Sequence, residues 1–155
     1  MLHIYVDADA CPVKREIYKV AGRYRLSVTL VANSWIQTPM DPRITLEVVK
    51  SDLDAADDWI VDQVDIGDVV VTTDIPLADR SLKKGAKVLS PTGRRFTDDN
   101  IGDALAGREL MSDLREAGIV GGGPSALSKE DRSRFLQRLD EDIQAIMRRN
   151  PIPEG

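Results

Sequence analysis

Five aspartates stand where their carboxylates could act together. Asp7 and Asp9 lie one residue apart in the segment VDADACPVK, directly after an apolar run, and Asp74 follows a valine-rich run. Asp54 and Asp57 are three residues apart, a spacing that puts both on one face of a helix. Converging carboxylates repel one another unless a cation neutralises them, and oxygen ligands without histidine or thiolate select Mg²⁺ or Mn²⁺. We therefore expect all five to be metal ligands, and Asp7, Asp9, Asp57 and Asp74 to be the catalytic residues.

The same aspartates also have a purely structural interpretation. Aspartates are common at strand ends and helix N-caps, where they accept hydrogen bonds from backbone N–H groups and interact favourably with the helix dipole. Taken alone, Asp54 fits a helix cap better than a ligand. The occurrence of acidic groups after several separate elements favours a shared site.

Other reactive side chains are scarce. The chain has one cysteine and one histidine, which excludes an internal disulfide framework, a cysteine-rich zinc site and most histidine chemistry. Cys11 is expected to be a small buried side chain rather than a nucleophile, because no second histidine is present to act as its base. Trp59 is expected in the core. For Trp35, packing in the protein and stacking on bases are equally compatible with the sequence.

The charge distribution bears on the kind of partner. A net charge of −5 argues against a protein that coats nucleic acid, because phosphate binding requires clustered lysine and arginine. A local basic patch remains compatible with this charge. Lys14 and Arg15 follow the first acidic pair, and Arg94 and Arg95 follow the last predicted strand. We expect these four to be substrate-binding residues that contact phosphate groups.

The elements that must position these residues alternate along the chain. Short β-branched runs, typical of buried strands, are separated by segments with helical periodicity. The pattern predicts an α/β three-layer sandwich with a mostly parallel sheet of about five strands and helices on both faces. In such sheets ligands bind beyond the carboxyl ends of the strands, where the aspartates are expected. The predicted strands cover residues 2–6, 26–32, 44–49, 68–74 and 86–90.

Two further helices are predicted after the sheet, over 97–117 and 128–149, joined by the flexible segment GGGPSA. Ser128 and Asp131 form a capping-box pattern at the start of the second. We expect one domain over 1–118, a linker and helix packed on it over 119–150, and a tail over 151–155. No apolar stretch approaches the ~20 residues that cross a bilayer, and no secretory signal is visible, so we expect a cytoplasmic protein without a membrane partner. The oligomeric state is open.

Several segments together resemble the signature blocks of a known family. The segments VDADACPVK, LVAN, DAADDWIV, VVTTDIPLA, KGAKVL, GRRFTDDNI and GGPSALSKEDRSRF are similar to those of the YaiI/YqxD family of bacterial proteins. The resemblance implies a PIN-like (NYN/PIN) domain, a fold whose active members are metal-dependent ribonucleases with clustered aspartates. It places the metal site on the five aspartates named above. The helix acid is often Glu in the wider PIN pattern, and Asp79 is the candidate for a further acidic partner.

Three functions remain open at this point. The first is hydrolysis of RNA phosphodiesters by Mg²⁺ or Mn²⁺ held on the aspartates. The second is a haloacid-dehalogenase-like phosphatase, with IYVDADAC as nucleophile strand and Lys83 or Lys84 as phosphate lysine, but the short spacing between VVVTT and the lysines is unfavourable. The third is a non-catalytic PIN-like binding module, in which the acids only cap helices or hold a structural cation.

Overall fold

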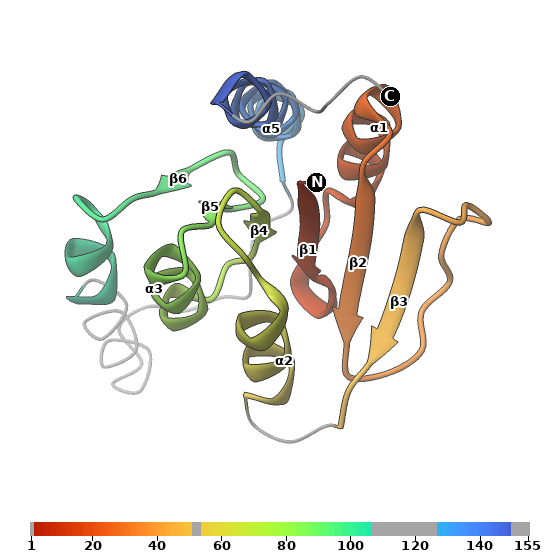
Figure 1. The fold of residues 1–155 in the computed structure, drawn as a ribbon, viewed down its shortest axis with the longest axis horizontal. Coiled ribbons are helices and arrows are strands. Elements are labelled where there is room, and N and C mark those ends of the chain that lie inside the picture. Colours follow the sequence, from red (N-terminus) through yellow and green to blue (C-terminus); the bar gives the residue numbers. More distant parts are fainter. Residues whose placement is uncertain (1, 51–53, 107–126, 150–155) are drawn as a thin grey trace.

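A six-stranded sheet forms the centre of the molecule (Figure 1). The computed structural model describes residues 2–50, 54–106 and 127–149. The strand order is β3-β2-β1-β4-β5-β6, with neighbours parallel except for the antiparallel pair β5 and β6. This confirms the predicted, mostly parallel α/β sheet. The strands are β1 (His3–Asp7), β2 (Ser27–Ala32), β3 (Ile44–Val48), β4 (Val69–Val71), β5 (Lys87–Leu89) and β6 (Arg95–Phe96).

Helices cover both faces of the sheet and make the three layers. Residues on one face pack against α1 and α5, and residues on the other face pack against α2 and α3 (Figure 1). A 3-10 turn, η1, joins β1 to α1, and residues 101–106 are also helical. The helices are α1 (Lys14–Tyr24), α2 (Ala55–Gln63), α3 (Ile75–Lys83) and α5 (Lys129–Arg149), and η1 covers Ala8–Ala10.

Two hydrophobic clusters, one on each face, hold the layers together. Side chains alternate along β1, so that Ile4 and Val6 join the cluster under α1 and α5 while Tyr5 joins the other. The β4 valines are almost completely buried because this central strand is covered on both faces. The consecutive valines of the sequence therefore mark the strand from which Asp74 follows.

Helix α5 runs beside α1 in the same direction. Near its start, the Arg132 guanidinium donates a 2.8 Å hydrogen bond to the carbonyl of Pro12, which precedes α1. Further along, the buried carboxylate of Asp140 accepts hydrogen bonds from Arg23 and Tyr24 at the end of α1. The capping box is present, since the Asp131 N–H donates to Ser128 Oγ at 3.0 Å and the Ser128 N–H donates to Asp131 Oδ2 at 3.2 Å.

The structure differs from the sequence prediction in some details. Strand β6 was not expected, because its two residues are too short for any periodicity to show. Pro12 is typical of a first helical position, but helix α1 begins at Lys14, since η1 occupies the turn after β1. Only residues 101–106 of the helix predicted over 97–117 lie in the described ranges; the rest of that helix, the GGGPSA segment and the tail lie outside them. Among the described helices, none combines the length and apolar character that a membrane span needs.

Candidate functional site

The strand order reverses between β1 and β4. From β1 the chain proceeds outward to β2 and β3, and it then returns to form β4 on the other side of β1. Loops leaving the carboxyl ends of two such strands diverge and leave a crevice, which is where open α/β sheets bind ligands. Asp7 is the last residue of β1, and Asp74 is the N-cap residue of α3 directly after β4. Both predicted site residues therefore lie at this reversal point.

A buried threonine connects these two aspartates. The hydroxyl of Thr72 donates a 2.9 Å hydrogen bond to Asp7 Oδ2 and accepts a 2.9 Å hydrogen bond from the backbone N–H of Asp74. Asp74 Oδ1 accepts from the backbone N–H of Leu77, also at 2.9 Å, and so caps α3. From the sequence, Thr72 stood out only as part of the VVVTT segment of the phosphatase alternative, and not as a partner of the aspartates. These bonds fix one oxygen of each carboxylate and orient both.

Asp57, in the first turn of α2, joins the group from a third element. Burial raises the pKa of Asp57 to about 7, and the negative charges of Asp74 and Asp7 add to the effect. The charge of Asp54 acts in the same direction on this pKa, and the Arg80 guanidinium acts against it. Three carboxylates from β1, α2 and the start of α3 are thus close enough to repel one another.

Asp7 experiences the same repulsion. Burial is the largest cause that raises the pKa of Asp7 above its usual value, and the hydrogen bond from Thr72 opposes it. The charges of Asp74 and Asp9 raise this pKa further. The carboxylates of Asp7 and Asp57 therefore ionise less readily than isolated aspartates, as expected where like charges share a poorly solvated site.

Asp9 and Asp54 lie at the margin of this group. Asp9 is exposed, and its Oδ2 accepts a 2.8 Å hydrogen bond from the backbone N–H of Asn33, which ties η1 to the end of β2. Asp54 is exposed in the N-cap position of α2, in a left-handed conformation with φ 67°, and its side chain makes no capping hydrogen bond. The expected capping role of Asp54 is thus not formed.

The donor chemistry fits a hard divalent cation, because carboxylate oxygens are the ligands that such cations prefer. Over 2–50, 54–106 and 127–149, however, no group of three or more His, Cys, Asp or Glu side chains is arranged to hold a metal ion. The carboxylates interact through their charges without enclosing a common point. Binding a cation at this edge of the sheet would require the carboxylates to move closer together.

The predicted basic residues line two depressions near this edge. Lys14 and Arg15 line one of about 470 Å³, together with Cys11 and the α5 residue Arg132. Burial raises the pKa of Cys11 to about 11, so that the thiol stays protonated at neutral pH, as expected for a structural cysteine.

Arg94 and Arg95 separate in the structure. Arg94 is exposed and lies over the ring of Phe96, 5.4 Å from its centroid. Arg95 is directed to α5, where its Nε donates to Asp142 at 3.0 Å and its Nη2 donates to Glu141 at 2.8 Å. Arg134 and Arg138, which were not among the predicted site residues, share a depression with these two. Their spacing of four residues in a predicted helix was the signal available in the sequence.

The residues of the phosphatase alternative lie elsewhere. Helix α3 begins beyond the carboxyl end of β4 and returns toward the start of β5, so that Lys83, its last residue, lies at the opposite edge of the sheet from Asp7. Lys83 pairs with Asp79 at 3.0 Å, which also removes Asp79 from the acidic group. This geometry does not provide the phosphate lysine that a haloacid-dehalogenase-like enzyme needs.

The two tryptophans differ in their surroundings. Trp59 is partly buried in the cluster under α2 and α3, and its ring meets Tyr5 edge to face at 6.2 Å. This packing agrees with the predicted core position of Trp59. Trp35 is 75% exposed, in the loop between β2 and β3.

Comparison with known proteins identifies relatives along almost the whole chain. Residues 5–145 match the model of the family described as "Uncharacterized BCR, YaiI/YqxD family". A UPF0178 protein of Rhodospirillum rubrum is 53% identical over 148 residues, which cover 95% of this chain and 99% of the relative. A UPF0178 protein of Rhodospirillum centenum is 55% identical over 152 residues, covering 96% and 99%. The chain therefore belongs to the YaiI/YqxD family.

Proposed function

We propose that this protein hydrolyses phosphodiester bonds in RNA, using Mg²⁺ or Mn²⁺ held by Asp7, Asp57 and Asp74, with Asp9 and Asp54 at the margin. The observation that carries the proposal is the meeting of Asp7 and Asp74, which the Thr72 hydroxyl joins by hydrogen bonds of 2.9 Å. Burial and the charges of these two residues raise the pKa of the nearby Asp57 to about 7. A helix cap gains nothing from neighbouring negative charge, whereas a cation site requires it. The position at the strand-order reversal supports the same conclusion.

Each of these residues has a definable part in the reaction. Thr72 orients Asp7 through its hydroxyl, and the Leu77 N–H orients Asp74. Burial and the charges of Asp74 and Asp7 raise the pKa of Asp57 to about 7 without metal, and a bound cation would hold this carboxylate ionised as one of its ligands. When bound, a divalent cation would polarise a phosphoryl oxygen and lower the pKa of a coordinated water.

RNA as the substrate is supported by the PIN-like resemblance and by the basic residues at this edge. The chain carries a net charge of −5, and its site is itself acidic, so that a polyanion needs local cationic groups to approach. Lys14 and Arg15 begin α1 just after η1, and Arg94 is exposed on the loop after β5. These are the groups from which a phosphate backbone would receive its contacts.

Cleavage of a labelled single-stranded RNA in Mn²⁺, in Mg²⁺ and in EDTA tests the proposal. We expect cleavage with either metal, none in EDTA, and a loss of at least about 100-fold in Asp57→Asn, because electrostatic stabilisation in a metal site contributes several kcal/mol. Asp62→Asn is the matched control, since Asp62 is an exposed aspartate on the same helix. Cleavage that continues in EDTA, or that Asp57→Asn leaves unchanged, would contradict the assignment.

A non-catalytic module is the second candidate. It is favoured by the absence, over 2–50, 54–106 and 127–149, of any group of three metal-ligating side chains arranged around an ion. Such a module would bind RNA without cleaving it in either metal. The same assay therefore separates the two candidates.

A further inference from the structure

Two neighbouring depressions form one groove between the loop after β5 and the first half of α5. Their volumes are about 690 Å³ and about 470 Å³, and they share Arg95, Arg134 and Arg138. We call this surface the arginine groove and define it by its cationic residues, Arg94, Arg95, Lys129, Arg134 and Arg138.

The loop side of the groove is built to lie directly on the helix. Gly93 has a φ of +88°, and a Cβ at this position would lie 2.9 Å from Arg134 Cγ and 3.0 Å from the backbone nitrogen of Phe135. The Arg138 guanidinium donates a 2.7 Å hydrogen bond to the Gly93 carbonyl. Inside the loop, the Arg94 N–H donates to Ser90 Oγ at 3.1 Å. The position of Arg94 beside α5 is therefore set by close backbone packing.

Only part of the positive charge in the arginine groove is neutralised. Arg95 pairs with Glu141 and Asp142, and Arg134 pairs with Asp131 at 3.1 Å. In the part of the chain that the structure describes, Arg94, Lys129 and Arg138 form no ion pair with a carboxylate. Glu130 and Glu141 also line the arginine groove, so that its five cationic side chains outnumber two acidic ones in a chain with a net charge of −5. Such a concentration of charge attracts polyanions.

The arginine groove begins at the same edge of the sheet as the aspartates. Leu89, the last residue of β5, is level with Val71 of β4, which is level with Val6 of β1. The loop after Leu89 therefore leaves the edge at which Asp7 lies, with only β4 between the two strands. Adjacent strands are about 4.8 Å apart, which puts β5 about 10 Å from β1.

We infer that the arginine groove binds the phosphodiester backbone of the RNA strand whose cleavage is proposed above, through Arg94, Lys129 and Arg138. The inference rests on the proposed function for its choice of ligand. Guanidinium groups match phosphate oxygens in planar, two-point hydrogen bonds, and a lysine adds a compact charge. Arg95 and Arg134 shape the surface through their ion pairs. The RNA strand then continues from the arginine groove along the same edge of the sheet toward Asp7.

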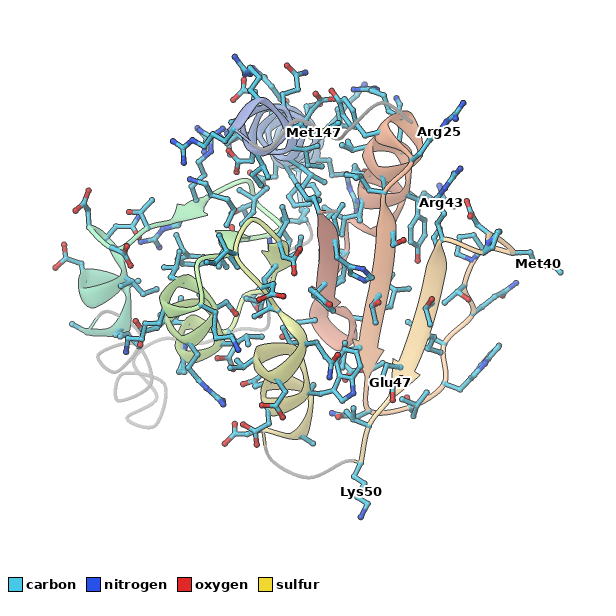
Figure 2. All side chains as sticks on the ribbon, in the orientation of Figure 1. Arg25, Met40, Arg43, Glu47, Lys50 and Met147 are labelled. Atoms are coloured by element: carbon cyan, nitrogen blue, oxygen red, sulfur yellow. The ribbon has the colours of Figure 1, made fainter. Side chains whose placement is uncertain are left out.

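Binding is measured in EDTA, by the fluorescence anisotropy of a labelled oligouridylate across a range of KCl concentrations. The variant Arg94→Ala/Arg138→Ala should bind about 10-fold more weakly, and its slope of log affinity against log salt should be flatter by about 1.4, since each phosphate contact on a single strand contributes about 0.7. The control is Arg43→Ala, which removes an exposed arginine at the opposite, amino edge of the sheet (Figure 2). This control should keep the affinity and slope of the parent protein.

A second variant guards against a change in folding. Arg138 holds the Gly93 carbonyl, so its loss can loosen the loop; Arg94→Ala/Lys129→Ala leaves this hydrogen bond in place. It should show the same flattening of the slope with the thermal midpoint of the parent. An unchanged slope in this variant, no binding by the parent protein, or equal displacement of RNA by polyglutamate would each overturn the inference.

The outcome also separates this inference from the proposed function. Binding that depends on Arg94 and Lys129 without any cleavage in Mn²⁺ would support the arginine groove and reject hydrolysis. Cleavage in Mn²⁺ with binding that these substitutions do not affect would support hydrolysis and reject the arginine groove. Asp57→Asn should abolish cleavage and keep the salt slope of binding in EDTA.

Discussion

The Thr72 hydroxyl donates a hydrogen bond to Asp7 across 2.9 Å and so joins the carboxyl ends of β1 and β4. Thr72 is 1% exposed, which means that the bond is shielded from water. The hydroxyl also accepts from the Asp74 N–H, and it is therefore the common partner of two candidate site residues. The loss of this one oxygen affects both.

Replacing Thr72 with valine preserves the shape of the side chain and removes the hydroxyl. The Asp7 carboxylate and the Asp74 N–H each lose a partner, so we expect a loss of about 1–3 kcal/mol in the free energy of unfolding, measured with urea. The pKa of Asp7 should rise further, because the hydrogen bond from Thr72 lowers it. Thr73→Val, at the exposed neighbouring position, is the control and should unfold like the parent. Equal stability of both variants would show that the bond is unimportant.

The raised pKa of Asp57 predicts how stability depends on pH without metal. Its value of about 7 in the folded state exceeds the ordinary 3.8, so the folded protein binds more protons than the unfolded chain between these values. This contribution to stability is present at acidic pH and is lost as the pH rises through about 7. Asp57→Asn should therefore stabilise the protein more at about pH 8 than at about pH 5 in urea unfolding with EDTA.

Two comparisons make the Asp57 measurement specific. Asp62→Asn, which removes an exposed charge from the same helix, is the control for the change of net charge. Addition of Mn²⁺ should raise the thermal midpoint of the parent and leave that of Asp57→Asn nearly unchanged, because binding to the folded state alone stabilises it. If Mn²⁺ leaves the thermal midpoint of the parent protein unchanged, the result would contradict the cation site.

We expect substitution of Asp140 to weaken the packing of α5 against α1 more than substitution of exposed α5 residues. Burial acts to raise its pKa, but hydrogen bonds from Tyr24, Gln144 and Arg23 outweigh burial and hold the pKa below its usual value. Asp140→Asn leaves the Arg23 charge without its partner and should cost about 2 kcal/mol in unfolding free energy, a figure reduced for the half-exposed arginine. Proteolysis within α5 should accelerate in this variant and stay at the parent rate in Glu130→Gln, an exposed position of the same helix.

The sign of the Asp140 contribution follows from the lowered pKa. Stability from this carboxylate is present above the ordinary value of 3.8 and is lost as the pH falls through the lower pKa of the folded state. The difference in unfolding free energy between the parent and Asp140→Asn should therefore shrink as the pH falls. A difference between the two that grows on acidification would contradict this interpretation.

Two glycines should respond to alanine in opposite ways. Gly93→Ala introduces a Cβ at φ +88° and into contact with the α5 backbone, so we expect a loss of about 1–3 kcal/mol in the free energy of unfolding. Gly22 lies within α1, and a Cβ added there would have no atom within 4 Å apart from its chain neighbours and the backbone of its own helix. Gly22→Ala should therefore raise the free energy of unfolding by about 0.5–1 kcal/mol. Equal effects of the two substitutions would show that the loop does not need Gly93.

The sequence by itself determined the elements and the ends at which the acids lie. Three β-branched residues in a row specified β4, because only a strand covered on both faces accepts such a run, and helical spacing specified α1 and α5. Asp7 and Asp74 could be assigned to strand ends because each directly follows an apolar run. These features depend only on residues that are close along the chain, so the local pattern of residue types is enough to predict them.

Only the tertiary structure decided which of these residues meet. Asp74 lies near Asp7 because β4 pairs with β1, and Asp57 joins them because α2 packs on the face that Tyr5 occupies. The adjacent residues Arg94 and Arg95 took different partners once α5 had docked: Arg95 pairs with Glu141 and Asp142, while Arg94 stays exposed. These relationships depend on contacts between segments tens of residues apart. Strand order and helix docking set such contacts, and a local pattern of residue types does not encode them.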